Sequence, residues 1–236
     1  MPIPGQYWCQ NDPVRTHFYD GWSILFPAWE RAFVCVAEHH KGAIKDQDLR
    51  QRVDTFCKQE LAHARAHQAH NKTHGLAEME AKELKKARLV MRRPNHQMWL
   101  ATMVSIEHMA ACGARTFLRR YEGQSSKELN LFKWHCREEL EHKSLAMDLW
   151  LHLGYPRSQL KRVAALNMFY VLRSVMRYTV EQCKKDGVLW KLSSMKSLLG
   201  LGMELVFKSW IPYTEIFRND FHPDNHNDQV FLQAAP

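Results

Sequence analysis

The sequence lacks the features that mark several common protein classes. None of its six cysteines forms a CxxC pair, which argues against a thiol redox motif or a cysteine-rich zinc site. No glycine-rich phosphate loop occurs, and no segment alternates apolar and polar residues over the length of a strand. The N-terminus also lacks a charged region followed by an apolar run. We therefore expect a helical, reduced, cytoplasmic protein.

The charge of the chain is not gathered into a nucleic-acid-binding surface. Lys and Arg number 33 against 25 Asp and Glu, but the basic residues are scattered and no basic block is interleaved with aromatic residues. Residues 189–210 are apolar, yet Lys191, Lys196, Glu204 and Lys208 interrupt them too often for a membrane span. We expect this segment to pack over the other helices or at a homodimer contact, rather than on a membrane surface.

Helical signals run through most of the chain. With 236 residues, 45% of them hydrophobic, the sequence is long enough for one domain with one core. Residues 1–20 are rich in Pro, Gly, Asn and Asp and predict an irregular lead-in, with the first helix beginning near Ser23 or Pro27. A later helix is predicted to start after Ser126 and to continue unbroken to His152.

The predicted fold class is all-α, a ferritin-like four-helix bundle with a long crossover and additional C-terminal helices. Residues 21–154 would form a metal-binding four-helix core, and residues 157–236 a helical elaboration. The crossover is the Ala-, Glu- and Lys-rich segment 76–90, which lies between the second and third core helices.

The stretch from Trp134 to Lys143 carries the main functional signal. At about 100° per residue on a helix, His135, Glu139 and His142 fall within one arc of roughly 60°. A solvated helix face needs charge, but it has no reason to align two imidazoles with a carboxylate. A divalent metal needs such a set of ligands.

A second helix carries a matching pattern. Glu60 and His63 stand at i, i+3, and His67 extends the same face by one turn. In the predicted first and third core helices, Glu30 and Glu107 are lone carboxylates among apolar residues, where an uncompensated charge is costly.

Together these residues match the ligand set of a dinuclear carboxylate site. Two helices supply one Glu each and two supply Glu-x-x-His, which is the arrangement found inside di-iron and di-manganese four-helix bundles. Bridging carboxylates neutralise two neighbouring cations, and imidazoles complete their coordination. The predicted metal ligands are Glu30, Glu60, His63, Glu107, His135, Glu139 and His142.

Each assignment has a structural alternative. Glu107 would otherwise be a buried ion-pair partner, and Glu30 a surface residue. His135 would otherwise support a ligand or fill the core. Two further residues are placed next to the ligands: His67 in a supporting or pocket role, and Glu138 as the partner of the His63 ring N–H, unless it is solvated.

Two resemblances follow from these motifs. Gln59-Glu60-x-x-His63-x-x-x-His67, the Trp134–Lys143 stretch and Phe221-His222-Pro223 resemble the bacterial family of predicted metal-dependent hydrolases over nearly the whole chain. The ligand order with the additional His135 resembles the non-haem di-iron arylamine N-oxygenases. The first resemblance implies metal-dependent hydrolysis, and the second implies oxygen chemistry at two irons.

The sequence leads us to expect a dinuclear iron oxygenase that activates O2 to oxidise a small organic substrate, with an external electron donor. The alternative is a hydrolase with a dinuclear Zn, Mn or Fe site, and a further one is a non-enzymatic, iron-binding ferritin-like protein. The sequence leaves open the role of His222. It also does not decide which apolar residues line a pocket rather than the core, among them Trp99, Met103, Phe132 and Phe169.

Overall fold

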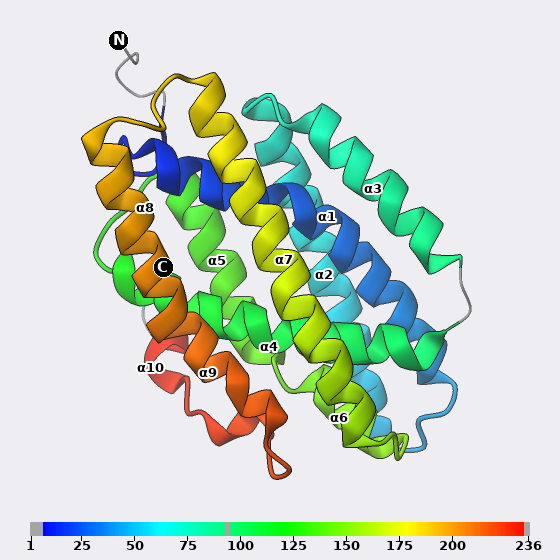
Figure 1. Cartoon of the computed structure of the whole chain (residues 1–236). Coiled ribbons are helices and arrows are strands. Elements are labelled where there is room, and N and C mark those ends of the chain that lie inside the picture. The colour runs from blue at the N-terminus through cyan, green and yellow to red at the C-terminus, as the bar shows by residue number, and fades with distance from the viewer. Residues whose placement is uncertain (1–6, 93–94, 234–236) are drawn as a thin grey trace.

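The computed structural model describes residues 7–92 and 95–233, and no strand occurs among them. Its longer helices are α1 Pro13–Lys41, α2 Gln47–Thr73, α3 Ala77–Met91, α4 His96–Arg120, α5 Lys127–His142, α6 Leu145–His152, α7 Arg157–Lys185 and α8 Leu192–Glu204 (Figure 1). Shorter segments follow: the π-helical turn η1 Leu205–Trp210, α9 Ile211–Tyr213, the 3-10 turns η2 Thr214–Phe217 and η3 Pro223–Asn225, and α10 Gln229–Leu232. The all-α prediction is confirmed.

Helix α1 begins ten residues before the first position predicted for it. The side chain of Asp12 accepts hydrogen bonds from the backbone N–H groups of Val14 and Arg15, and Pro13 occupies the first helical position. This is an ordinary N-cap, since a proline at the first position has no N–H that needs a partner. The predicted irregular lead-in is therefore wrong for residues 13–20, while residues 1–6 lie outside the described ranges.

Pro27 lies inside α1 and does not start it. A proline in a helix leaves the carbonyl four residues earlier without its backbone donor, which here is that of Ser23. The side-chain amide of Asn71 on α2 donates to this carbonyl at 2.9 Å. A side chain from the neighbouring helix therefore replaces the missing hydrogen bond, so α1 continues through the proline.

The helix predicted to run unbroken to His152 is interrupted. It ends as α5 at His142, and α6 begins at Leu145. The intervening Lys143 is buried, with its ammonium donating to the backbone carbonyl of His226 and to Asp228, both at 2.6 Å. No helix-breaking residue marks this position, so the sequence gives no local sign of the interruption.

The helices that carry the predicted ligands pack around one another. Helix α1 lies along α2, and α4 packs against both α5 and α7. In Figure 1, α4 runs across the molecule, whereas α5 and α7 run from top to bottom. Helix α7 also packs on α1, so the C-terminal part of the chain covers the ligand-bearing helices. The ferritin-like bundle topology stays a prediction.

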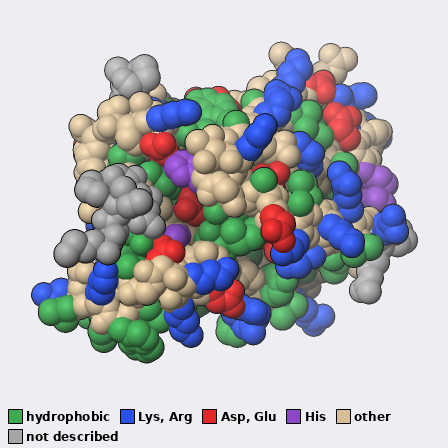
Figure 2. Space-filling view, turned by 90° about the horizontal axis from the view of Figure 1, so that it is seen from above, with side chains coloured by type: hydrophobic (Ala, Val, Ile, Leu, Met, Phe, Trp, Pro, Cys, Tyr) green, Lys and Arg blue, Asp and Glu red, His purple; other side chains and the backbone are tan. Residues whose placement is uncertain are grey.

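The C-terminal segments are held by buried ion pairs and leave part of α8 exposed. Arg115 on α4 makes two hydrogen bonds of 2.7 and 2.8 Å to Asp228, which lies just before α10. On α8, Leu201 is buried, whereas Leu192 and Leu199 on its outer side are each 68% exposed. Figure 2 shows such hydrophobic side chains beside Lys and Arg side chains on the molecular surface. None of the described helices has the length and apolar character needed to cross a membrane.

Candidate metal centre

All seven predicted ligands lie in one buried cluster, which we call the metal centre. Helix α1 contributes one residue, α2 two, α4 one and α5 three. None is more than 7% exposed. The cluster members are Glu30, Glu60, His63, Glu107, His135, Glu139 and His142. Four helices distant in sequence therefore bring four carboxylates and three imidazoles to one place.

One half of the metal centre surrounds His142. Its Nε2 lies 3.3 Å from Glu60 Oε1, and its Nδ1 lies 3.3 Å from Glu107 Oε2. His63 Nδ1 completes this half, at 3.6 Å from Glu60 Oε1 and 4.0 Å from Glu139 Oε1. Potential ligand atoms of Glu60, His63, Glu139 and His142 all lie within 4.8 Å of one another, close enough to share one ion.

The other half surrounds His135. Its Nε2 lies 2.7 Å from Glu139 Oε1 and 3.6 Å from Glu30 Oε1. Atoms of Glu30, His63 and His135 form a second group within 4.8 Å. Because His63 belongs to both groups, the two potential ion positions are neighbours, as a dinuclear site requires.

Many polar atoms of the metal centre have no hydrogen-bond partner although they are buried. Buried polar groups are almost always satisfied in folded proteins, so a concentration of exceptions needs an explanation. These atoms are potential ligands, and bound cations would satisfy most of them. They are both carboxylate oxygens of Glu30, Glu60 Oε1, Glu107 Oε2, Glu139 Oε2, His63 Nδ1 and both ring nitrogens of His142.

Burial and crowding of like charges perturb the acid–base behaviour of these groups. Burial, reinforced by neighbouring carboxylates, raises the pKa values of Glu30 and Glu107 well above their usual range, and burial raises that of Glu60 to about 7. Burial opposes protonation of His63, but the nearby carboxylates of Glu138 and Glu60, which favour the protonated ring, outweigh it and raise its pKa to about 10. Without a metal, protons neutralise the cluster. A bound cation would displace them.

Glu138 orients the ring of His63 from outside the cluster. Its Oε2 lies 2.9 Å from His63 Nε2, and its Oε1 accepts a 2.8 Å hydrogen bond from the indole N–H of Trp134. Since an ionised carboxylate only accepts hydrogen bonds, His63 carries its proton on Nε2 toward Glu138. His63 Nδ1 faces the carboxylates of the metal centre; it carries a second proton in the metal-free protein, and a bound cation would replace that proton.

A longer chain of hydrogen bonds fixes the tautomer of His135. The Asn71 amide donates to Glu80 and to the Ser23 carbonyl, so its oxygen is the atom that faces the Ser23 hydroxyl at 2.7 Å. The Ser23 hydroxyl donates its one hydrogen to the Asn71 oxygen, and it therefore accepts a hydrogen bond from the N–H group at His67 Nδ1, 2.8 Å away. The pKa of His67 is lowered by burial, so its ring is neutral. His67 Nε2 therefore accepts the proton of His135 Nδ1 at 2.7 Å.

This chain, here called the relay, leaves His135 Nε2 without a proton. Burial also lowers the pKa of His135, so the ring is neutral and has one N–H. Its Nε2 lone pair then faces Glu139 and Glu30, both acceptors when ionised. A lone pair so close to a carboxylate oxygen requires a proton or a metal ion beside it.

The relay contains two functional candidates that the sequence did not single out, Ser23 and Asn71, and both are 0% exposed. The two residues are 48 positions apart in the chain, on α1 and α2, so no local spacing reveals their contact. The one available sign is Pro27, whose place inside a helix implies an outside donor for the Ser23 carbonyl.

The remaining sequence candidates lie in different places. Phe132 lines a cavity beside the metal centre, whereas Met103 is fully buried in the core and Phe169 is 66% exposed. Trp99 packs half-buried against the core. His222 is outside the metal centre, with its Nε2 2.9 Å from Asp148 Oδ1.

The donor set fits divalent ions such as Zn, Mn or Fe, which bind imidazole and carboxylate together. The protein family described as predicted metal-dependent hydrolase matches residues 3–227. The chain belongs to this family. Membership in the predicted metal-dependent hydrolases agrees with the buried group of ligating side chains, and it favours the hydrolase alternative over the expected oxygenase. No curated protein and no solved structure matches the chain.

Proposed function

We propose that the protein is a hydrolase that uses two divalent metal ions held in the metal centre. The observation that carries this proposal is the set of buried, unpartnered ligand atoms on four helices. It is supported by membership in a family described as metal-dependent hydrolases.

The residues divide into two overlapping ligand groups. Glu60 and His142 would hold one ion, with Glu107 on the other side of the His142 ring, and Glu30 and His135 would hold the other ion. His63 and Glu139 lie between the two groups. Two cations offset the repulsion among four buried carboxylates, and the imidazoles supply neutral donors. The relay and Glu138 hold His135 and His63 with their lone pairs turned inward.

When bound, the metal pair lowers the pKa of water and polarises the scissile bond. Glu139 is the carboxylate that lines both the metal centre and the adjoining cavity. Its Oε1 lies against His63 and His135, whereas its buried Oε2 has no partner, so Oε1 would hold metal and we assign to Oε2 the transfer of a proton from the attacking water to the leaving group. Water thereby adds across the bond, with one fragment taking OH and the other taking H.

A second candidate is the oxygenase, with two Fe ions and an external electron donor. It is favoured by one observation: the cavity beside the metal centre is lined almost entirely by apolar side chains. Such a wall suits O2 and a hydrocarbon group, and it offers few donors to a developing oxyanion.

Metal-specific assays separate the two candidates. Metal-free protein is reloaded with Zn, Mn or Fe(II), and each form is tested for hydrolysis of aryl and alkyl esters without O2. The Fe(II) form is also tested for O2 consumption with a chemical reductant. Hydrolysis that needs metal but not O2 supports the first proposal. O2 consumption with no hydrolysis in any form overturns it in favour of the oxygenase.

The matched variants for this assay lie two residues apart on α5. Glu139→Gln removes a charged ligand, whereas Glu141→Gln changes an exposed residue of the same type. The proposal predicts loss of activity in the first variant and wild-type activity in the second. Full activity in Glu139→Gln contradicts the role given to this residue.

A further inference from the structure

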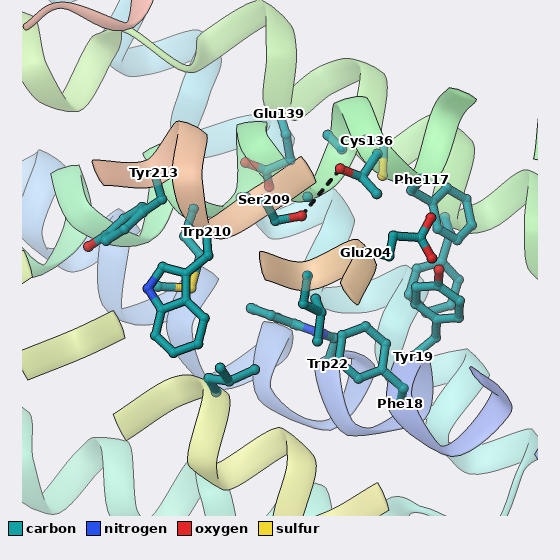
Figure 3. Close-up of a pocket in the computed structure, with 18 of the residues that line it drawn as sticks. Phe18, Tyr19, Trp22, Phe117, Cys136, Glu139, Glu204, Ser209, Trp210 and Tyr213 are labelled. Atoms are coloured by element: carbon teal, nitrogen blue, oxygen red, sulfur yellow. Dashed lines mark hydrogen bonds between the residues drawn. The ribbon is translucent and has the colours of Figure 1, made fainter. Parts of the chain in front are cut away.

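A cavity of about 140 Å³ adjoins the metal centre. It lies among residues of α1, α4, α5, α7, α8, η1 and α9 (Figure 3). Of the seven cluster residues, only His135 and Glu139 contribute to its wall. In Figure 3 the Glu139 side chain lies at one side of the cavity next to Cys136, across from Trp22 and Phe18. The cavity therefore has a polar end, formed by His135 and Glu139 at the metal centre. We call the rest of its space the body of the cavity.

The wall of the cavity body is mostly apolar, and several of its polar groups are already hydrogen-bonded. The Thr116 hydroxyl lies 3.2 Å from that of Ser209, the contact drawn dashed in Figure 3, and it also donates to the Lys208 carbonyl. The Tyr213 hydroxyl donates to the Ala164 carbonyl at 3.0 Å. These hydroxyls are occupied by one another or by backbone carbonyls, so the surface that faces the space is mostly aromatic ring and aliphatic carbon.

The charged group at the opposite side is also neutralised. Glu204 is 8% exposed and pairs with Arg15 at 2.9 Å and with Arg120 at 3.2 Å. A ligand that brought a charge into the body would lose its hydration without gaining a free partner. The part of a ligand that fits the body must therefore be uncharged and apolar.

Gly113 creates part of this space. It lies in the interior of α4, where glycine is the least favourable residue after proline. A Cβ built at this position meets no atom within 4 Å, so close packing does not require glycine. The residue lines the cavity, and a side chain placed there would enter it.

We propose that this cavity binds the apolar part of the substrate, an uncharged aryl or compact alkyl group of about benzene size, and that the reacting bond lies at Glu139 and His135. The size follows from the volume, because an apolar cavity of about 150 Å³ binds benzene. A π-helical turn, the type of local irregularity often found at functional sites, supplies Leu205, Ser209 and Trp210 to the wall. The assignment of the reacting end rests on the proposed function. The binding of the apolar group does not.

Calorimetric titration with benzene and with benzoate tests the cavity without requiring turnover. The wild-type protein should bind benzene, and it should bind benzoate more than about tenfold more weakly because the carboxylate would be desolvated. Gly113→Leu should weaken benzene binding by about tenfold or more by filling the space. Gly202→Leu is the control, since Gly202 is outside the cavity and its Cβ also meets nothing within 4 Å.

Metal content and melting temperature are measured on both variants, so that a folding defect is recognised. Wild-type benzene binding by a folded Gly113→Leu protein overturns the proposal, as does benzoate binding as tight as that of benzene. If benzene binding follows the prediction but no metal-loaded form hydrolyses or oxidises a substrate, the cavity stands and the proposed function fails. If Gly113→Leu hydrolyses phenyl and methyl esters with the wild-type preference, the cavity assignment fails while the metal function stands.

Discussion

Replacing Ser23 with alanine tests whether the relay holds His135 as a metal ligand. The hydroxyl accepts a hydrogen bond from His67 Nδ1 at 2.8 Å and donates one to Asn71 at 2.7 Å. Both partners are 0% exposed, so water does not reach them to replace the lost hydroxyl. In Ser23→Ala the tautomer of His67 is no longer fixed. If His67 carries its proton on Nε2, that N–H group faces the N–H group of His135 Nδ1, and the hydrogen bond between the two rings is lost.

The expected loss can be estimated from the position of Ser23. Changes to groups that orient a metal ligand cost about 10–100-fold in metal affinity. Because Ser23 acts on His135 through one intermediate ring, we expect the lower end, about tenfold, which corresponds to about 1.4 kcal/mol. The two groups left unpartnered also destabilise the metal-free fold by about 1–3 kcal/mol.

Competition with a chromophoric chelator measures Zn affinity, and thermal melts of the metal-free protein measure the second effect. Thr179→Val is the control, since it removes a buried hydroxyl that bonds only to a backbone carbonyl of its own helix, that of Val175. Wild-type Zn affinity in Ser23→Ala would refute the reasoning that the relay fixes a ligating His135.

Three other outcomes follow from the structure. Asp228→Asn should destabilise the protein by about 3–5 kcal/mol because it strands two buried cations, Arg115 and Lys143, whereas Asp220→Asn at an exposed pair should leave the melting temperature unchanged. Burial alone would raise the pKa of Asp228, but Arg115 and Lys143 outweigh it and lower that pKa below the usual 3.8. The stabilisation by Asp228 is therefore fully present above pH 3.8 and is lost as the pH falls through the lower pKa of the folded state. Acid titrations of the stability of both variants check this. Trp150→Ala should cost about 3–5 kcal/mol in denaturant melts, while Trp190→Ala, at a side chain 79% exposed, should cost almost nothing. Metal removal by a chelator should lower stability by about 2.7 kcal/mol relative to protein with free metal at 100 times its dissociation constant, which a shift of the melting temperature measures.

Helix periodicity and the interruption of apolar runs were sufficient to find the seven residues that the structure brings together, and their binding of metal stays a prediction. Glu60 and His63 share a face because they are one turn apart, and His135, Glu139 and His142 do so over two turns. Burial of Glu30 and Glu107 was foreseeable because each interrupts an apolar run. Helix face and burial are local properties, so the spacing of residues along the sequence was enough to predict them.

Properties that depend on contacts between helices were not foreseeable. The start of α1 was missed because Pro27 was interpreted as a first-turn residue, although Asn71 satisfies the carbonyl that the proline leaves free. The break after His142 depends on the burial of Lys143 against Asp228, more than 80 residues away. The cavity arises from side chains of seven segments, and only the unexplained glycine at position 113 hints at it.

The most direct test of the metal centre is the metal stoichiometry of the purified protein and of two α5 variants, measured by elemental analysis after equilibration with Zn or Fe(II). A dinuclear centre should hold two ions per chain in the wild type and in Glu141→Gln, and fewer in Glu139→Gln. A wild-type protein that binds no metal, or a Glu139→Gln variant that retains both ions with wild-type affinity, would contradict it.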